Sequence, residues 1–279
     1  MSHITMFHTL GIVKNITGIG EEETELRIES EREMVNQCDC IIAATEREKT
    51  DLVRYYNAPQ DRIAIIPCGF NPGLFRPVDR QEARNALRLD NGKIILFVGR
   101  IDPLKGLKNM IKAMPSLDDT LLPELVIVGG DEYSREEFRS LQTFAAELDI
   151  QEKVSFRGSV GQDKLPFFYS AADVCVIPSY YESFGLVALE SLACGTPVVA
   201  TDVGDMKNIL KDRISGAVIE NNASDTLART VSEYLYRQEK GDEKAFRRAS
   251  IMKYSWSNIA DRMVREYERL HVARTTICG

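Results

Sequence analysis

Two glutamates, Glu182 and Glu190, stand on either side of a turn, with seven residues between them. On one continuous helix they would lie about 80° apart around the axis and about 12 Å apart along it, so they would not form a close pair of acids. If Glu182 lies in a loop and Glu190 in the second turn of a helix, both can face one crevice. In the alternative, neither glutamate binds a ligand: Glu182 complements the helix dipole, and Glu190 is a solvated or capping residue. For two glutamates taken alone, that alternative is preferred.

The segment between the two glutamates predicts the start of a helix. Ser183-Phe-Gly-Leu opens it, and Gly195 with the proline that follows ends it. The first free N–H groups, from Phe184, Gly185 and Leu186, would point into the crevice and favour an anion. Gly185 would also let a ligand approach the backbone closely.

A second segment combines two cations with two glycines. Gly99 is expected to end a strand and Gly106 to open a helix, so Arg100 and Lys105 lie in a loop at the carboxyl edge of the sheet. Arg can bond two phosphate oxygens at once and Lys supplies a mobile point charge, so this loop suits a phosphate. Either cation alone is more often a surface residue. Because this loop is expected on the same sheet edge as Glu182, a functional role for the two cations is favoured.

Two further loops at this edge carry glycines that permit close approach: Val128-Gly-Gly follows one expected strand, and Phe156-Arg-Gly-Ser, with Arg157 and Gly158, follows the next. Each signal is weak alone. Four such loops on one edge argue for a single binding crevice.

A parallel sheet is needed to bring these loops together. From residue 80 onward, short apolar strands alternate with helices, which predicts a doubly wound α/β sheet with ligands at the strand carboxyl ends. Helices are expected at 80–89, 106–114, 134–148 and 163–170, and strands at 93–98, 124–128, 153–156, 173–177 and 216–219. Three helices at 223–236, 242–252 and 256–270 follow.

The first 67 residues also alternate strand and helix, but they are too few for a finished sheet. A loop is expected over 8–14 and an acidic helix over 21–37, in which Arg27 and Glu31 are spaced for an i,i+4 pair. Thr45 should cap the next helix. The segment 67–77, dense in Pro and Gly, predicts an inter-domain linker.

Composition excludes several classes of function. The net charge of −7 comes without a basic stripe, so nucleic-acid binding has no electrostatic support. No apolar run approaches the roughly 20 residues that span a bilayer, and no secretory pattern opens the chain, so the default compartment is the cytoplasm. Six cysteines without C-x-x-C spacing and three histidines without H-E-x-x-H make a metal site or a disulfide framework unexpected.

Taken in order, Gly99-Arg100 with Lys105-Gly106, Phe156-Arg-Gly158, and Glu182-Ser-Phe-Gly-Leu with Glu190 resemble the retaining glycosyltransferases of the group-1 family, which have the glycosyltransferase B fold of two Rossmann-like domains. The resemblance covers almost the whole chain. His8-Thr-Leu-Gly with Lys14-Asn15 is most similar to the branch that contains sucrose-phosphate synthase and D-inositol-3-phosphate glycosyltransferase.

The resemblance implies a nucleotide-sugar donor, UDP-linked, and no metal cofactor. Arg100 and Lys105 would hold the diphosphate, and Glu190 the ribose. Glu182 would contact the transferred sugar. The other implied contacts are the base at Arg157 and Gly158, the sugar and phosphate at Gly99 and at Ser183, Phe184, Gly185 and Leu186, the donor sugar at His8, and a phosphorylated sugar or inositol acceptor at Arg27 and Lys14.

The chain departs from the family pattern at its start, where further strand and helix units and a glycine-rich loop are expected. We therefore interpret residues 1–67 as the remnant of an acceptor-side domain, 68–252 as the donor-binding domain and 253–279 as a helix that crosses back. An exposed edge of the incomplete sheet would favour self-association.

Two classes of function remain open at this point. One is a hexosyltransferase, or the donor-binding part of one. The other is a nucleotide-sugar-binding module without transfer activity of its own. A phosphorylase-like or epimerase-like function is a weaker third, because neither explains Glu182 and Glu190 together with Arg100 and Lys105.

Overall fold

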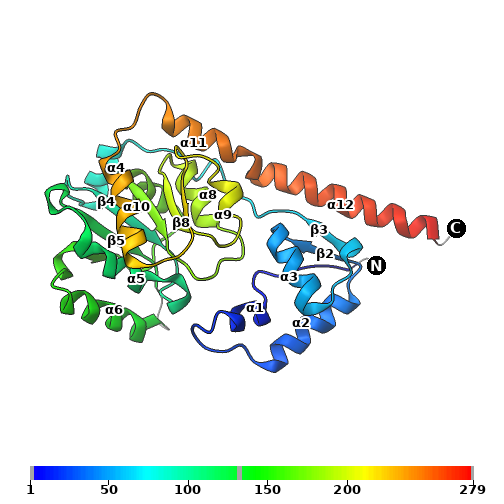
Figure 1. The fold of residues 1–279 in the computed structure, drawn as a ribbon. Helices are drawn as coiled ribbons and strands as arrows, with labels where there is room; N and C mark the ends of the chain where they lie inside the picture. The colour runs from blue at the N-terminus through cyan, green and yellow to red at the C-terminus, as the bar shows by residue number, and fades with distance from the viewer. Residues whose placement is uncertain (1–2, 131–133, 278–279) are drawn as a thin grey trace.

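The computed structural model describes residues 3–130 and 134–277, and it contains two parallel sheets (Figure 1). The smaller sheet has the order β1-β2-β3, and the larger has the order β6-β5-β4-β7-β8-β9. The strands are β1 (Ile4–Met6), β2 (Cys40–Ala43), β3 (Ile63–Ile65), β4 (Ile94–Val98), β5 (Glu124–Val128), β6 (Val154–Phe156), β7 (Val174–Ile177), β8 (Val198–Thr201) and β9 (Gly216–Ile219). The predicted α/β class with two Rossmann-like units, the first with the smaller sheet, is confirmed.

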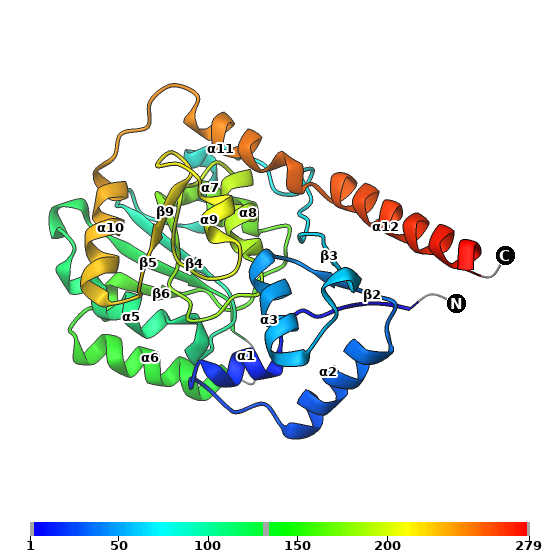
Figure 2. The same cartoon turned by 45° about the vertical axis from the view of Figure 1, so that its right-hand side comes forward.

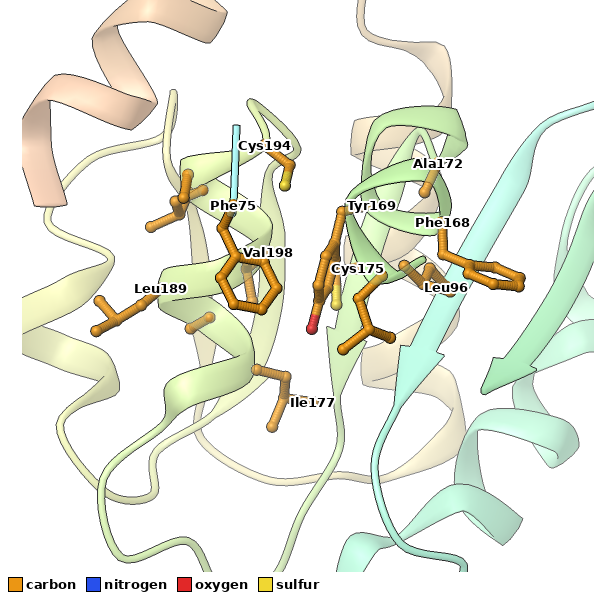
Figure 3. Close-up of a cluster of buried hydrophobic side chains, with 14 of the residues drawn as sticks. Phe75, Leu96, Phe168, Tyr169, Ala172, Cys175, Ile177, Leu189, Cys194 and Val198 are labelled. Carbon is orange, nitrogen blue, oxygen red and sulfur yellow. The ribbon is translucent and has the colours of Figure 1, made fainter. Parts of the chain in front are cut away.

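Alternating side chains give the larger sheet two buried faces. Leu96 and Cys175 point to one face, and Ile95 and Val174 to the other. Figure 3 shows the first face, where Tyr169 packs among buried apolar residues. The helices over this face are α4 (Arg80–Leu87), α7 (Leu165–Ala171), α8 (Leu186–Ala193) and α11 (Glu243–Ile251); those over the other are α5 (Leu107–Ala113), α6 (Arg135–Glu147) and α10 (Ser224–Tyr236).

The strand order creates a switch point between β4 and β7. From β4 the chain runs outward through β5 to β6, and it then returns to β7 and runs outward the other way through β8 to β9. The strands β4 and β7 are neighbours, and the loops that follow them lead towards opposite edges of the sheet. In open α/β sheets this divergence leaves the crevice in which ligands bind.

The smaller sheet is covered on one face by α2 (Glu25–Gln37) and α3 (Glu46–Tyr56) and on the other by α12 (Trp256–Ile277) (Figures 1 and 2). Ile41 and Ala43 face the first pair of helices, while Cys40 and Ile42 face α12. The Thr45 hydroxyl accepts the N–H of Glu48 at 2.9 Å, which confirms the predicted cap of α3. The C-terminal helix thus belongs to the core of the N-terminal sheet.

Only some of the apolar residues of α12 are buried. Ile259 and Met263 pack against the smaller sheet together with Leu270, but Trp256, Val264 and Tyr267 are each more than half exposed. The buried positions recur at four and seven residues, so the helix rotates the remaining apolar residues away from the sheet.

One local prediction is wrong for a reason of tertiary structure, and one helix was not predicted. The segment predicted as a loop over 8–14 includes the start of the helix α1 (Gly11–Ile16), whose first N–H groups are accepted by Glu31, at 3.0 Å from Gly11, and by the Tyr56 hydroxyl, at 3.1 Å from Ile12. These acceptors lie 20 and 44 residues away. The short helix α9 (Met206–Ile209) has no counterpart among the predicted elements.

None of the helices in the described ranges combines the length and the apolar character that crossing a membrane requires.

Candidate active site

A cavity of about 300 Å³ lies at the switch point between β4 and β7. The loop after β4, the loop after β7 and the first turn of α8 form most of its wall; His8 from the N-terminal part and Cys68 from the linker complete it. The lining is His8, Cys68, Phe97, Val98, Gly99, Arg100, Lys105, Val176, Ile177, Ser179, Glu182, Ser183, Phe184, Gly185, Leu186, Val187 and Met206. Most of the predicted donor-site residues therefore meet in one cavity.

An ion pair crosses this cavity between the two predicted loops. Lys105 Nζ donates to Glu182 Oε1 at 2.7 Å, and Ser179 Oγ donates to the same oxygen at 2.8 Å. Both charged side chains are less than one-fifth exposed. The cation is thereby held at a defined place without being sealed off from a ligand.

Backbone contacts join these two loops. The N–H of Tyr180 donates to the carbonyl of Leu104 at 2.8 Å. Gly106 has φ +64°, and a Cβ there would lie 2.0 Å from the carbonyl oxygen of Pro178. Only glycine allows this approach, so Gly106 sets the position of Lys105 opposite Glu182.

The start of α8 differs from the prediction. The helix begins at Leu186 rather than at Ser183, because Gly185 has φ +126° and the Phe184 carbonyl accepts the N–H of Asp205 at 2.8 Å. The first two residues of the helix, Leu186 and Val187, line the cavity, and N–H groups in this position have no acceptor within the helix. The start of the helix can still attract an anion, but through residues further along the chain than the sequence predicts.

Arg100 lines the cavity with a largely exposed side chain. Its guanidinium is 3.6 Å from the Asp102 carboxylate, and two-thirds of the side chain is accessible. Arg100 is thus an exposed cation, whereas Lys105 is largely buried and paired with Glu182.

Glu190 lies outside this cavity. Its carboxylate accepts a hydrogen bond from the Tyr169 hydroxyl at 2.7 Å, and burial raises the pKa of Glu190 to about 7. The expectation that Glu182 and Glu190 face one crevice is thus not met by this cavity: only Glu182 lines it.

Gly158 lines a second cavity of about 300 Å³ beside the first. Gly129 and Gly130 from the loop after β5 form part of its wall, with Ile101 from the loop after β4. A Cβ at Gly129 would lie 1.8 Å from the Gly99 carbonyl oxygen, so this glycine lets the two loops touch. Arg157 does not line the cavity, and its guanidinium lies 3.8 Å from the Glu124 carboxylate.

The predicted acceptor residues sit apart from both cavities and are paired with carboxylates. Lys14 and Arg27 both contact Glu23, and Arg27 Nε also donates to Glu31 at 2.9 Å, which confirms the predicted i,i+4 pair. Arg27 further donates to the Thr9 side chain at 2.7 Å. Through Arg27, this network holds Thr9, the residue that follows the cavity-lining His8.

Sequence reasoning missed several residues of this region. Ser179 directly follows the strand-ending proline, so its position at the strand end could have revealed it. Cys68 reaches the first cavity from the linker and Met206 from the unpredicted helix α9, and neither segment carries a local signal for a binding site. Across the described residues, no group of three or more side chains suited to a metal ion comes together.

Comparisons with known proteins agree with this architecture. A family model described as glycosyl transferases group 1 matches residues 79–250, and one described as glycosyltransferase family 4 matches residues 2–74. Two parallel α/β units with a cavity at the switch point of the larger sheet define the glycosyltransferase B class of protein. The chain belongs to the group 1 glycosyltransferase family.

Within the family, the chain is similar to D-inositol 3-phosphate glycosyltransferases. It is 37% identical to that of Mycolicibacterium gilvum over 94% of this chain and 59% of the relative, and 36% identical to that of Acidothermus cellulolyticus over 96% and 62%. The chain thus spans about 60% of the length of these curated relatives.

Solved structures show the same fold. Sucrose-phosphate synthase from Thermosynechococcus elongatus superposes with a TM-score of 0.80 at 31% identity, over 97% of this chain and 68% of that one. Anabaena HepE, in complex with UDP and glucose, gives a TM-score of 0.83 at 18% identity, over 95% and 71%. The second likeness concerns the fold alone.

Proposed function

We propose that this chain is a retaining hexosyltransferase, or the donor-binding part of one. Its donor would be a UDP-linked sugar of the glucose or N-acetylglucosamine type, and its acceptor a sugar phosphate, an inositol phosphate or another hydroxyl compound. The observation that carries this proposal is the convergence of the Lys105–Glu182 pair, the first turn of α8 and His8 on one cavity.

In this proposal the donor diphosphate lies between the two cations and the start of α8. Lys105 and Arg100 bind phosphate oxygens, while the N–H groups of Leu186 and Val187 supply further donors. Glu182 and His8 contact the sugar. The base occupies the neighbouring cavity beside Gly158, and Glu190 receives the ribose hydroxyls.

These groups suit a reaction in which a nucleoside diphosphate leaves. Negative charge grows on the departing phosphate, and fixed cations and N–H dipoles stabilise it more in the transition state than in the ground state. The acceptor oxygen forms its bond to the anomeric carbon on the face from which the diphosphate departs, and its proton passes to a phosphate oxygen. Retention then requires no protein nucleophile.

A second candidate is a nucleotide-sugar-binding module that performs no transfer alone. The larger sheet and its loops supply nearly the whole cavity, and among the described residues of 1–67 only His8 lines it. This distribution supports our proposed division into 1–67, 68–252 and a crossing helix at 253–279. A transfer assay of the purified 279-residue chain with UDP-glucose and an inositol phosphate separates the two candidates, since product formation excludes the binding module.

Calorimetry of UDP binding tests the donor site directly. We expect UDP to bind more tightly than uridine, because Lys105 contributes a charge-assisted contact to the diphosphate. Lys105→Met should weaken UDP binding by about 1.5–3 kcal/mol and leave uridine binding unchanged. Lys108→Met, which removes an equal charge from the next helix, is the matched control. Equal affinities for UDP and uridine in the unmodified chain would rule out the diphosphate site.

A further inference from the structure

The cavity beside Gly158 has two walls of different character. Glycines of the loops after β5 and β6 form one wall. One face of α6 forms the other, with lining residues that recur at intervals of three and four: Arg135, Phe138, Arg139 and Gln142. Of the described residues that line this cavity, two are cations and none is a carboxylate. The helix therefore presents positive charge to the cavity.

Both of these cations lack a partner within the described chain. Arg135 and Arg139 are exposed, and neither makes a hydrogen bond or an ion pair with any residue that the structure describes. Arg157, the residue that the family resemblance implies at the base, instead has its guanidinium 3.8 Å from the Glu124 carboxylate and does not line the cavity. The side-chain donors available at this cavity therefore come from α6, and no sequence pattern had indicated them.

The glycine wall supplies shape and close approach. Gly158 has φ +67°, and a Cβ there would meet no atom within 4 Å, so this residue borders open space. The N–H of Gly129 is already used, because it donates to the Gly158 carbonyl at 2.8 Å. Ile101 and Phe138 add apolar surface, and the Phe138 ring is supported by Phe156, with ring centroids 4.8 Å apart. With a volume of about 300 Å³, the cavity has room for a planar ring whose polar edge faces α6.

We infer that Arg135 and Arg139 select the base of the donor nucleotide, and that they favour the carbonyl-bearing bases uracil and guanine over cytosine and adenine. This inference rests on the proposed function and deepens it. Arginine carries five N–H donors and no acceptor, so it can bind a carbonyl oxygen of uracil, or O6 and N7 of guanine. Cytosine and adenine present an amino group at the corresponding position. That group is itself a donor, and facing an arginine it leaves two donors unpaired.

The comparison of UDP with CDP isolates this contact. The two nucleotides share ribose and diphosphate and differ only at the edge of the pyrimidine, so cations that merely attract the phosphates affect both equally. Calorimetry of the unmodified chain should show UDP bound about five- to tenfold more tightly than CDP, which corresponds to one charge-assisted hydrogen bond at an exposed site. In the double variant that combines Arg135→Gln with Arg139→Gln, the ratio of the two affinities should approach one.

Lys112→Gln is the matched control, because it removes an equal charge from an exposed position of α5 that lines neither cavity. It should leave the ratio of the UDP and CDP affinities unchanged. Arg135→Gln and Arg139→Gln, measured singly, show how the contact is divided between the two guanidinium groups. Because both arginines are exposed, neither substitution should change the midpoint of thermal unfolding.

GDP and ADP repeat the comparison for purines, which distinguishes the two carbonyl-bearing bases. Tighter binding of UDP than of CDP identifies uracil, and tighter binding of GDP than of ADP identifies guanine. Either preference supports the inference if the double variant loses it. Equal affinities within both pairs, tighter binding of CDP or ADP, or a preference that persists in the double variant would each overturn it.

Lys105→Met, measured alongside, keeps this inference distinct from the donor proposal. If UDP binding depends on Lys105 but the affinities within both nucleotide pairs are equal, only the assignment to α6 is refuted. If none of the four nucleotides binds the unmodified chain, the proposed donor site is refuted, and the selection of a base with it.

Discussion

At the scale of single residues, the site is defined by how each charge is held. Lys105 is held by Glu182 at 2.7 Å and is largely buried, whereas Arg100 is largely exposed and lies 3.6 Å from Asp102. Glu190 differs from both, because it lies half-buried against the Tyr169 hydroxyl with its pKa raised to about 7. An acid with that pKa changes its charge within the ordinary working range, so a role that requires its ionised form must depend on pH.

We expect the affinity for UDP to rise between about pH 6 and pH 8, since the ionised Glu190 accepts ribose hydrogen bonds that the neutral acid accepts less well. Glu190→Gln should remove the part of this rise that belongs to the ribose. Calorimetry with UDP and deoxy-UDP at three pH values measures it. If deoxy-UDP binds the unmodified chain as well as UDP does at pH 8, the proposed contact between Glu190 and the ribose is wrong.

At the scale of elements, the first turn of a helix contributes to the candidate site at α8 and holds a buried glutamate, Glu48, at α3. Glu48 lies in the first turn of α3, where its carboxylate accepts the N–H of Ala44 at 2.6 Å. Burial raises its pKa to about 7 from an ordinary value of 4.5. The folded chain therefore binds this proton more tightly than the unfolded chain, and stability from this group is lost as pH rises through that interval.

Because of this linkage, we expect the free energy of unfolding to fall by about 1–3 kcal/mol from Glu48 between pH 5 and pH 8. Glu48→Gln keeps an acceptor for the Ala44 N–H and should remove that part of the decline, so that the variant is the more stable protein at pH 8. Glu46→Gln, an equal charge change at an exposed position of the same helix, is the control. Urea denaturation at each pH gives the comparison; parallel profiles for the two variants would contradict the assignment.

At the scale of the whole molecule, the two sheets differ in size and in support. The larger has six strands with helices on both faces, while the smaller has three strands and depends on α12 to cover one of its faces. The edge strand β1 also leaves backbone groups available for pairing. Stability should therefore be uneven along the chain.

Limited proteolysis should reveal this difference. We expect the first cuts to fall before about Pro67, and a fragment from about Lys93 to Tyr236 to persist longest. Mass spectrometry of a time course identifies the fragments. Equal survival of the two regions would mean that α12 and the smaller sheet form a unit as stable as the larger one.

Local patterns in the sequence were enough for the class of fold and for the loops that line the cavity at the switch point. Short apolar strands, the cap at Thr45 and the glycines after strands are local signals, since they depend on neighbours a few residues away. Parallel strands place their carboxyl ends on one edge, so Lys105 and Glu182 could be expected on the same side of the sheet.

Tertiary structure alone decided what depends on residues far apart in the chain. The direct pairing of Lys105 with Glu182 follows from the switch point that puts β4 beside β7, across 77 residues. Helix α1 forms because Glu31 and Tyr56 accept its first N–H groups, and the Glu190 carboxylate accepts the Tyr169 hydroxyl, 21 residues away. In each case the free energy of a polar group depends on a partner that the fold supplies, and no local pattern specifies that partner.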